Sequence, residues 1–171
     1  MKNIIDFSKT RLKALQRFRK GKGPWGVYQG HFFVMNPDRT AICFIRPREF
    51  DASKGASVNF SPWAAPLDVG NYEVNLETGE IIDTIKGEAV RIESKPLTSQ
   101  SLDTYLYPWK RKESTANVAA PRVGVGTAKL AMQTFEAFGV EALTMDFHNT
   151  FQFCEGYTRD TVVYIVLSGV R

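Results

Sequence analysis

Basic residues are concentrated in one short stretch near the start of the sequence. Residues 9–22 contain seven lysines and arginines and no acidic residue. If this stretch is helical, at about 100° per residue, one narrow face carries Lys9, Lys13, Arg17 and Lys20. Such a row of cations can contact the phosphates of a nucleic acid. A solvated helix face, a membrane-surface helix or a partner-binding helix would show the same pattern.

The basic stretch is predicted to belong to a helix that starts near Asp6 or Ser8 and ends at Gly21. Arg11 falls among the apolar residues of this helix, so its charged end must reach past them or make a second contact. The apolar residues are Ile4, Phe7, Leu15 and Phe18.

A second basic cluster, rich in aromatic residues, lies in the middle of the chain. Its members are Tyr105, Tyr107, Trp109, Lys110, Arg111 and Lys112. Aromatic rings can stack on the bases of a single strand while cations hold its phosphates. An equally good interpretation is that the rings complete the edge of a core and the basic residues form a solvated loop.

The sequence offers little catalytic chemistry. There are only two histidines, His31 and His148, and no Cys-x-x-Cys or His-x-x-x-His pair that could begin a metal site. The run from Gly124 to Lys129 lacks the spacing of either nucleotide-binding fingerprint. We therefore expect no enzyme, and no catalytic residue, metal or cofactor.

The last third of the chain changes from a helical to a strand pattern. Apolar residues recur at helical spacing at Ala128, Ala131, Met132, Phe135 and Phe138. Thr127 is expected to cap this helix, and Gly139 is expected to end it in the left-handed conformation. From residue 143 onward the apolar positions alternate, which predicts three closely spaced strands.

The final strand, from Thr161 to Leu167, is apolar on both faces. Neither face should meet water, so the strand is expected either in the centre of a sheet or at an edge where copies of the chain associate. Val162, Tyr164 and Val166, which share one face, are the candidates for self-association.

The N-terminal part predicts the same order of elements, a helix followed by strands near 25–29, 31–35 and 40–46. The fold class is therefore α+β. We expect two helix-plus-antiparallel-meander units, at residues 1–60 and 121–171, around a β-hairpin and loop region at 61–120. The three segments are expected to form one compact domain.

This order of elements resembles DNA sliding clamps, the ring-shaped processivity factors of replication. The resemblance is clearest over residues 124–171, in AKLAMQTFEAFGVEALTMDFHNTFQF followed by TVVYIVLSGVR. It implies helices that face duplex DNA without reading its sequence, and strands that form an outer wall and subunit edges. It adds Lys129 to the four residues of the first helix as a DNA contact. It also implies a homo-oligomer and, as a further partner, a polymerase or another replication protein.

Composition sets broader limits. The formal charge of +4 permits nucleic-acid binding without establishing it, and no apolar run is long enough to span a bilayer. Cys43 and Cys154 are expected as buried thiols in a reducing, cytoplasmic compartment, or in the host cytoplasm if the protein is viral, with a disulfide left open. The alternative to a clamp-like tether is a small phage-type protein that binds single-stranded nucleic acid or inhibits a host protein.

Overall fold

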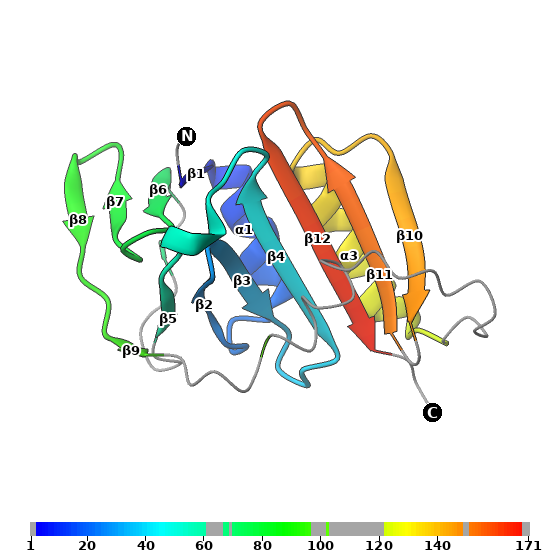
Figure 1. Ribbon diagram of the computed structural model, residues 1–171. Coiled ribbons are helices and arrows are strands. Elements are labelled where there is room, and N and C mark those ends of the chain that lie inside the picture. Colours follow the sequence, from blue (N-terminus) through cyan, green and yellow to red (C-terminus); the bar gives the residue numbers. More distant parts are fainter. Residues whose placement is uncertain are drawn as a thin grey trace.

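The computed structural model describes residues 3–60, 67–68, 70–96, 102, 122–148 and 151–168. Within them the protein is α+β, with two α-helices and two antiparallel sheets (Figure 1). The helices are α1 (Lys9–Phe18) and α3 (Val125–Ala137), with a short 3-10 helix, η1 (Ala52–Lys54). The strands are β1 (Ile4–Phe7), β2 (Trp25–Tyr28), β3 (His31–Met35), β4 (Ala41–Pro47), β5 (Ser57–Phe60), β6 (Tyr72–Asn75), β7 (Ile81–Asp83), β8 (Glu88–Val90), β9 (Ser94–Pro96), β10 (Leu143–His148), β11 (Phe151–Tyr157) and β12 (Thr161–Ser168).

The large sheet has the strand order β10-β11-β12-β4-β3-β2-β5-β9. Helix α1 is followed by the meander β2-β3-β4, and α3 is followed by the meander β10-β11-β12. The last strands of the two meanders pair antiparallel, with Ala41 opposite Leu167 and Pro47 opposite Thr161. Outward from this β4–β12 seam, the strands follow as β4-β3-β2 on one side and as β12-β11-β10 on the other. Each set of three strands follows a helix in the chain, so an approximate twofold relation connects the two units.

The small sheet has the order β1-β6-β7-β8 and corrects the expected start of the first helix. Ile4 and Phe7 belong to β1, which pairs with β6, and they are not on the helix. The reason is a period of two: Ile5 and Phe7 are buried while Ile4 and Asp6 are exposed. The helix begins only after Ser8, whose hydroxyl accepts a hydrogen bond from the Arg11 amide.

The middle of the chain contributes strands to both sheets. β5 pairs with β2 and β9 at one side of the large sheet, while the hairpin of β6 and β7 joins β1 in the small one. Strand pairing therefore crosses the boundary expected at residue 60. The β-hairpin predicted within residues 61–120 is present, formed by β6 and β7.

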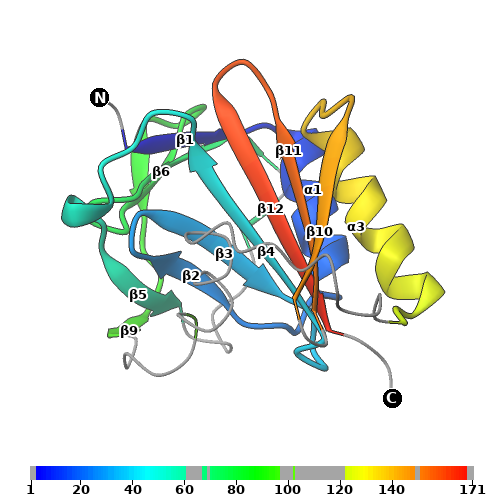
Figure 2. The same cartoon turned by 45° about the vertical axis from the view of Figure 1, so that its right-hand side comes forward.

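One face of the large sheet holds the main core, against which both helices lie (Figure 2). Helix α1 contributes Leu12, Leu15 and Phe18, and α3 contributes Ala131, Phe135 and Phe138 as it ends. Facing them from the sheet are Val27, Phe32, Cys43, Ile45, Cys154, Val163 and Ile165. Every second residue of these strands points at the helices, as the pleat of a strand requires.

The opposite face of the sheet carries a second apolar cluster. The Tyr164 ring lies between Phe44 and Phe153, with centroid separations of 6.1 and 5.8 Å, and Leu102 is buried with them. Tyr164 and Val166 belong to this cluster and, like Val162, are 1% exposed. Because β12 pairs with both β11 and β4, these three residues do not lie at a free edge. The central-strand alternative is correct and their assignment to self-association is wrong.

Helix α3 also differs from expectation at its start. Its N-cap is Gly124, in an extended conformation without a side-chain capping bond, so Thr127 lies inside the helix. The Gly124 carbonyl accepts the first helical bond, from the Ala128 amide at 2.9 Å. The predicted end is confirmed, because Gly139 has φ +78°, a conformation that glycine adopts without steric cost.

Candidate nucleic-acid interface

Helix α1 turns three basic side chains toward solvent, and a fourth follows just beyond its end. Its buried side consists of Leu12, Ala14, Leu15 and Phe18. Lys9, Lys13 and Arg17 are exposed on the other side, and Lys20 is exposed just beyond the helix, with φ +49°. The row predicted from the helical period therefore exists, although the helix is shorter than expected.

Helix α3 lies beside α1 on the same face of the large sheet (Figure 2). Lys129 is exposed on it, so the structure brings this residue to the same side of the sheet as the basic row of α1. The exposed surface of α3 is otherwise mixed. Val125 is 86% exposed and Met132 36% exposed, and Glu136 adds a negative charge.

Arg11 links the two helices. Its guanidinium carbon lies 4.9 Å from the centroid of the Phe138 ring, which is the C-cap residue of α3, and its Nη1 donates to the Asp6 carbonyl at 3.2 Å. The contact combines attraction to the face of the ring with attraction to the negative end of the helix dipole. The side chain thus makes the second contact predicted for a cation on the apolar side.

Arg19, the remaining arginine of the basic stretch, is not part of the surface row. It is the C-cap residue of α1 and is only 4% exposed, beneath the end of the helix. Its Nε donates to the Gly23 carbonyl at 2.8 Å. Continued one residue beyond Phe18, the helical period places Arg19 on the apolar side with Leu12 and Leu15. The pattern of the helix was therefore a signal for this burial.

The aromatic and basic cluster of the middle segment lies outside the described residues. Its members are Tyr105, Tyr107, Trp109, Lys110, Arg111 and Lys112. Their stacking and phosphate-binding roles remain predictions from the sequence.

His31 and the two cysteines, which sequence reasoning weighed for catalysis, are all buried in the core. His31 is fully buried, with Nδ1 2.9 Å from the Gln29 carbonyl oxygen and its ring against Phe50. Cys43 and Cys154 are buried free thiols, as predicted. Burial raises the pKa of both, that of Cys154 to about 11, so neither is a ready nucleophile at neutral pH. Within the described residues no group of His, Cys, Asp and Glu side chains has the arrangement of a metal site.

An open groove beyond the start of α1 was not predicted. It is lined by three arginines and three carboxylates from separate segments of the chain: Asp6, Arg11, Arg48, Glu49, Arg159 and Asp160. The Arg48 amide donates to the Asp160 carbonyl at 2.9 Å, which ties the end of β4 to the turn before β12. The six residues come from three segments that are far apart in sequence, and the β4–β12 pairing brings two of these segments together. The balance of charge gives this groove no preference for anions.

Comparisons with known proteins leave the family open. No protein-family model matches the chain, and no curated protein sequence matches it significantly. In the part of the chain that the structure describes, neither helix is long and apolar enough to cross a membrane.

Proposed function

We propose that this protein binds duplex DNA without reading its sequence, through the exposed surface of α1 and α3, and acts as a clamp-like tether. The observation that carries the proposal is the exposed row of Lys9, Lys13 and Arg17 on α1, continued by Lys20 and lying on the same side of the sheet as Lys129. The resemblance to sliding clamps gives this surface its expected partner.

The spacing of the row suits a phosphate backbone. Eight residues separate Lys9 from Arg17, which at 1.5 Å per residue is about 12 Å along the helix. Successive phosphates of one DNA strand advance about 3.4 Å along the duplex axis, so the row extends over about three to four of them. Lysine supplies flexible point charges that suit contacts with phosphate oxygens and carry no base specificity.

Tethering follows from such contacts. Phosphate contacts that ignore the bases are nearly equivalent at every position along the duplex, so the protein can slide. In this proposal α1 and α3 face the duplex, while the large sheet lies behind them. A homo-oligomer that surrounds the DNA and a polymerase or other replication protein as partner complete the proposal.

The test is a salt titration of duplex binding. We expect the triple variant Lys9→Glu, Lys13→Glu and Arg17→Glu to bind more weakly. The slope of log K against log salt should also fall in magnitude by about 0.9 for each phosphate that the variant no longer neutralises. Fluorescence anisotropy with an arbitrary duplex measures both quantities, and circular dichroism checks the fold.

A matched control removes the effect of total charge. Lys54→Glu, Lys86→Glu and Lys95→Glu alter three exposed lysines that lie on η1, the β7–β8 turn and β9, away from the two helices. The control should keep most of the wild-type salt slope. An equal weakening of binding in the two triple variants would remove α1 from the interface. Tight binding to a single strand that neither triple variant weakens would favour the alternative single-strand binder.

A further inference from the structure

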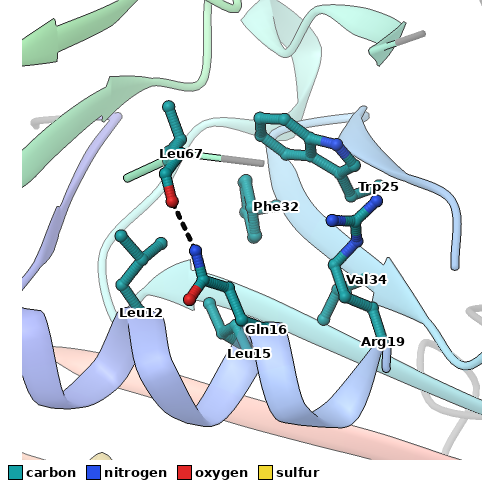
Figure 3. Close-up of a pocket in the computed structure, with 8 residues that line it drawn as sticks. All are labelled: Leu12, Leu15, Gln16, Arg19, Trp25, Phe32, Val34 and Leu67. Atoms are coloured by element: carbon teal, nitrogen blue, oxygen red, sulfur yellow. Dashed lines mark hydrogen bonds between the residues drawn. The ribbon is translucent and has the colours of Figure 1, made fainter. Parts of the chain in front are cut away.

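A small cavity lies between the C-terminal half of α1 and the first strands of the large sheet (Figure 3). Most of its lining is apolar, with Leu15 from the helix and Phe32 from β3 among the residues that form it. Two buried nitrogen groups, from Arg19 and Trp25, also line it. The space is about the size of one water molecule or one chloride ion.

Arg19 brings a positive charge into this cavity. The side chain is 4% exposed, and its Nε–H is used by the Gly23 carbonyl. Its Nη1 is buried and has no hydrogen-bond partner among the described residues. Burial lowers the pKa of the guanidinium, and no described carboxylate contributes an opposing effect. The charge is therefore buried without a counter-ion among the described residues.

Trp25 brings a second donor to the same cavity. The residue is 3% exposed, and its indole Nε1 is also buried, with no hydrogen-bond partner in the part of the chain that the structure describes. The ring is held by Phe60 and Phe32, with centroid separations of 4.5 and 5.9 Å. Its N–H is thus fixed in place by packing, which is how a binding site is preorganised.

The polar atoms of the cavity are biased toward donors. Gln16 uses its amide Nε2 to donate to the Leu67 carbonyl, which stabilises the rim of the cavity (Figure 3). The described residues of the lining include no aspartate or glutamate. A buried donor without a partner is costly, and a buried unpaired cation is more costly still. A neutral water could accept from both donors but would leave the charge of Arg19 uncompensated.

We propose that this cavity binds one small monovalent anion, a halide or a small carboxylate such as formate, between Arg19 Nη1 and Trp25 Nε1. The anion accepts both hydrogen bonds and neutralises the guanidinium. Larger dianions such as phosphate exceed the space. The site is independent of the proposed DNA surface, because Arg19 points beneath the helix whereas Lys9, Lys13 and Arg17 point away from it.

The test is thermal unfolding at constant ionic strength, with gluconate as an anion too large for the cavity. Replacing gluconate with bromide in one series, or with formate in another, should raise the melting temperature of the wild type by about 3 °C, with saturation. The two series distinguish a halide from a carboxylate. Arg19→Gln and Trp25→Phe should lose the shift, the second while keeping a ring between Phe32 and Phe60.

Arg17→Gln is the matched control, because it removes the same charge from an exposed position two residues away. It should keep the full shift. A crystal grown with bromide should show an anomalous peak within hydrogen-bond distance of both nitrogens. The proposal fails if the wild type shows no shift in either series, if all variants shift equally, or if the bromide-grown crystal contains water at this position.

Discussion

Basic residues of one short stretch occupy three different environments. Lys13 is exposed to solvent, Arg11 lies over an aromatic ring of the neighbouring helix, and Arg19 is buried in a cavity. The helical period separates the first two, because the apolar side of α1 passes through Arg11. Arg19, the C-cap residue, lies on the continuation of the same apolar side, where the sheet covers it. A residue type therefore indicates a function only together with the local backbone.

The turn after α1 depends on a glycine. A Cβ added at Gly23 would lie 1.8 Å from the carbonyl oxygen of Met35, so the backbone of β3 would have to move. We expect Gly23→Ala to destabilise the protein by about 2–4 kcal/mol, through overpacking against a rigid strand. Denaturant unfolding measures the change.

Gly126→Ala is the natural comparison for this variant. Gly126 lies within α3, and a Cβ there would meet nothing within 4 Å. Alanine favours the helix over glycine, so we expect a gain of up to about 1 kcal/mol. Similar unfolding free energies for the two alanine variants would show that the chain after α1 does not pack closely against β3.

Elements with a long, consistent period were predicted well. The three strands of each meander are found close to their expected positions, because turn-forming residues such as Gly30 and Pro37 separate short apolar runs. β1 was missed because Ile4 and Phe7 fit a helical period as well as a strand period, and its partner β6 lies some 70 residues away. The small sheet could not be predicted without that pairing.

The candidate site was predictable to a similar extent. The row of Lys9, Lys13 and Arg17 follows from the helical period, and the structure confirms its exposure. The proximity of Lys129 depends on the packing of α3 beside α1, which the local sequence does not contain. The cavity at Arg19 needs a helix end, a tryptophan on β2 and a carbonyl from residue 67 together. Such a combination has no local pattern in the sequence.

β12 illustrates how both faces of a strand can be buried within one chain. Val166 is 1% exposed, on the face away from the helices. We expect Val166→Lys to unfold the protein or prevent its expression, because an unpaired ammonium buried there costs several kcal/mol. Soluble yield and circular dichroism measure the outcome.

Ile85→Lys provides the control for this change. Ile85 is 74% exposed in the turn between β7 and β8, so the same gain of charge should leave stability within about 0.5 kcal/mol of the wild type. A folded Val166→Lys variant with native spectra would show that the second face of the sheet is open to solvent.

At the scale of the whole molecule, the β4–β12 seam joins two helix-plus-meander units into one sheet. It places α1 and α3 on one face and, among the described strands, leaves β10 and β9 as the outer strands of the large sheet. Outer strands carry backbone groups that can pair with another chain. Since β12 is internal, any self-association through the large sheet has to use these outer strands.

β10 is the longer of the two, with six residues against three, and Met145 on it is 50% exposed. Pairing of β10 with β10 of a second copy would be isologous and would stop at a dimer. Pairing of β10 with the opposite side of the next copy would be heterologous and could close a ring. A clamp that surrounds DNA needs the second arrangement, so we expect a discrete oligomer larger than a dimer.

Light scattering coupled to gel filtration measures this directly. In Met145→Lys, an added charge on the outer strand should reduce the oligomer to a monomer with an unchanged fold. Val125→Lys adds the same charge at an 86% exposed site on α3 and should leave the mass unchanged. A wild type that stays monomeric at all concentrations would remove the ring from the proposed function but leave the DNA-binding surface. A dimer abolished by Met145→Lys would establish isologous pairing of β10, and a tether would then have to hold DNA without surrounding it.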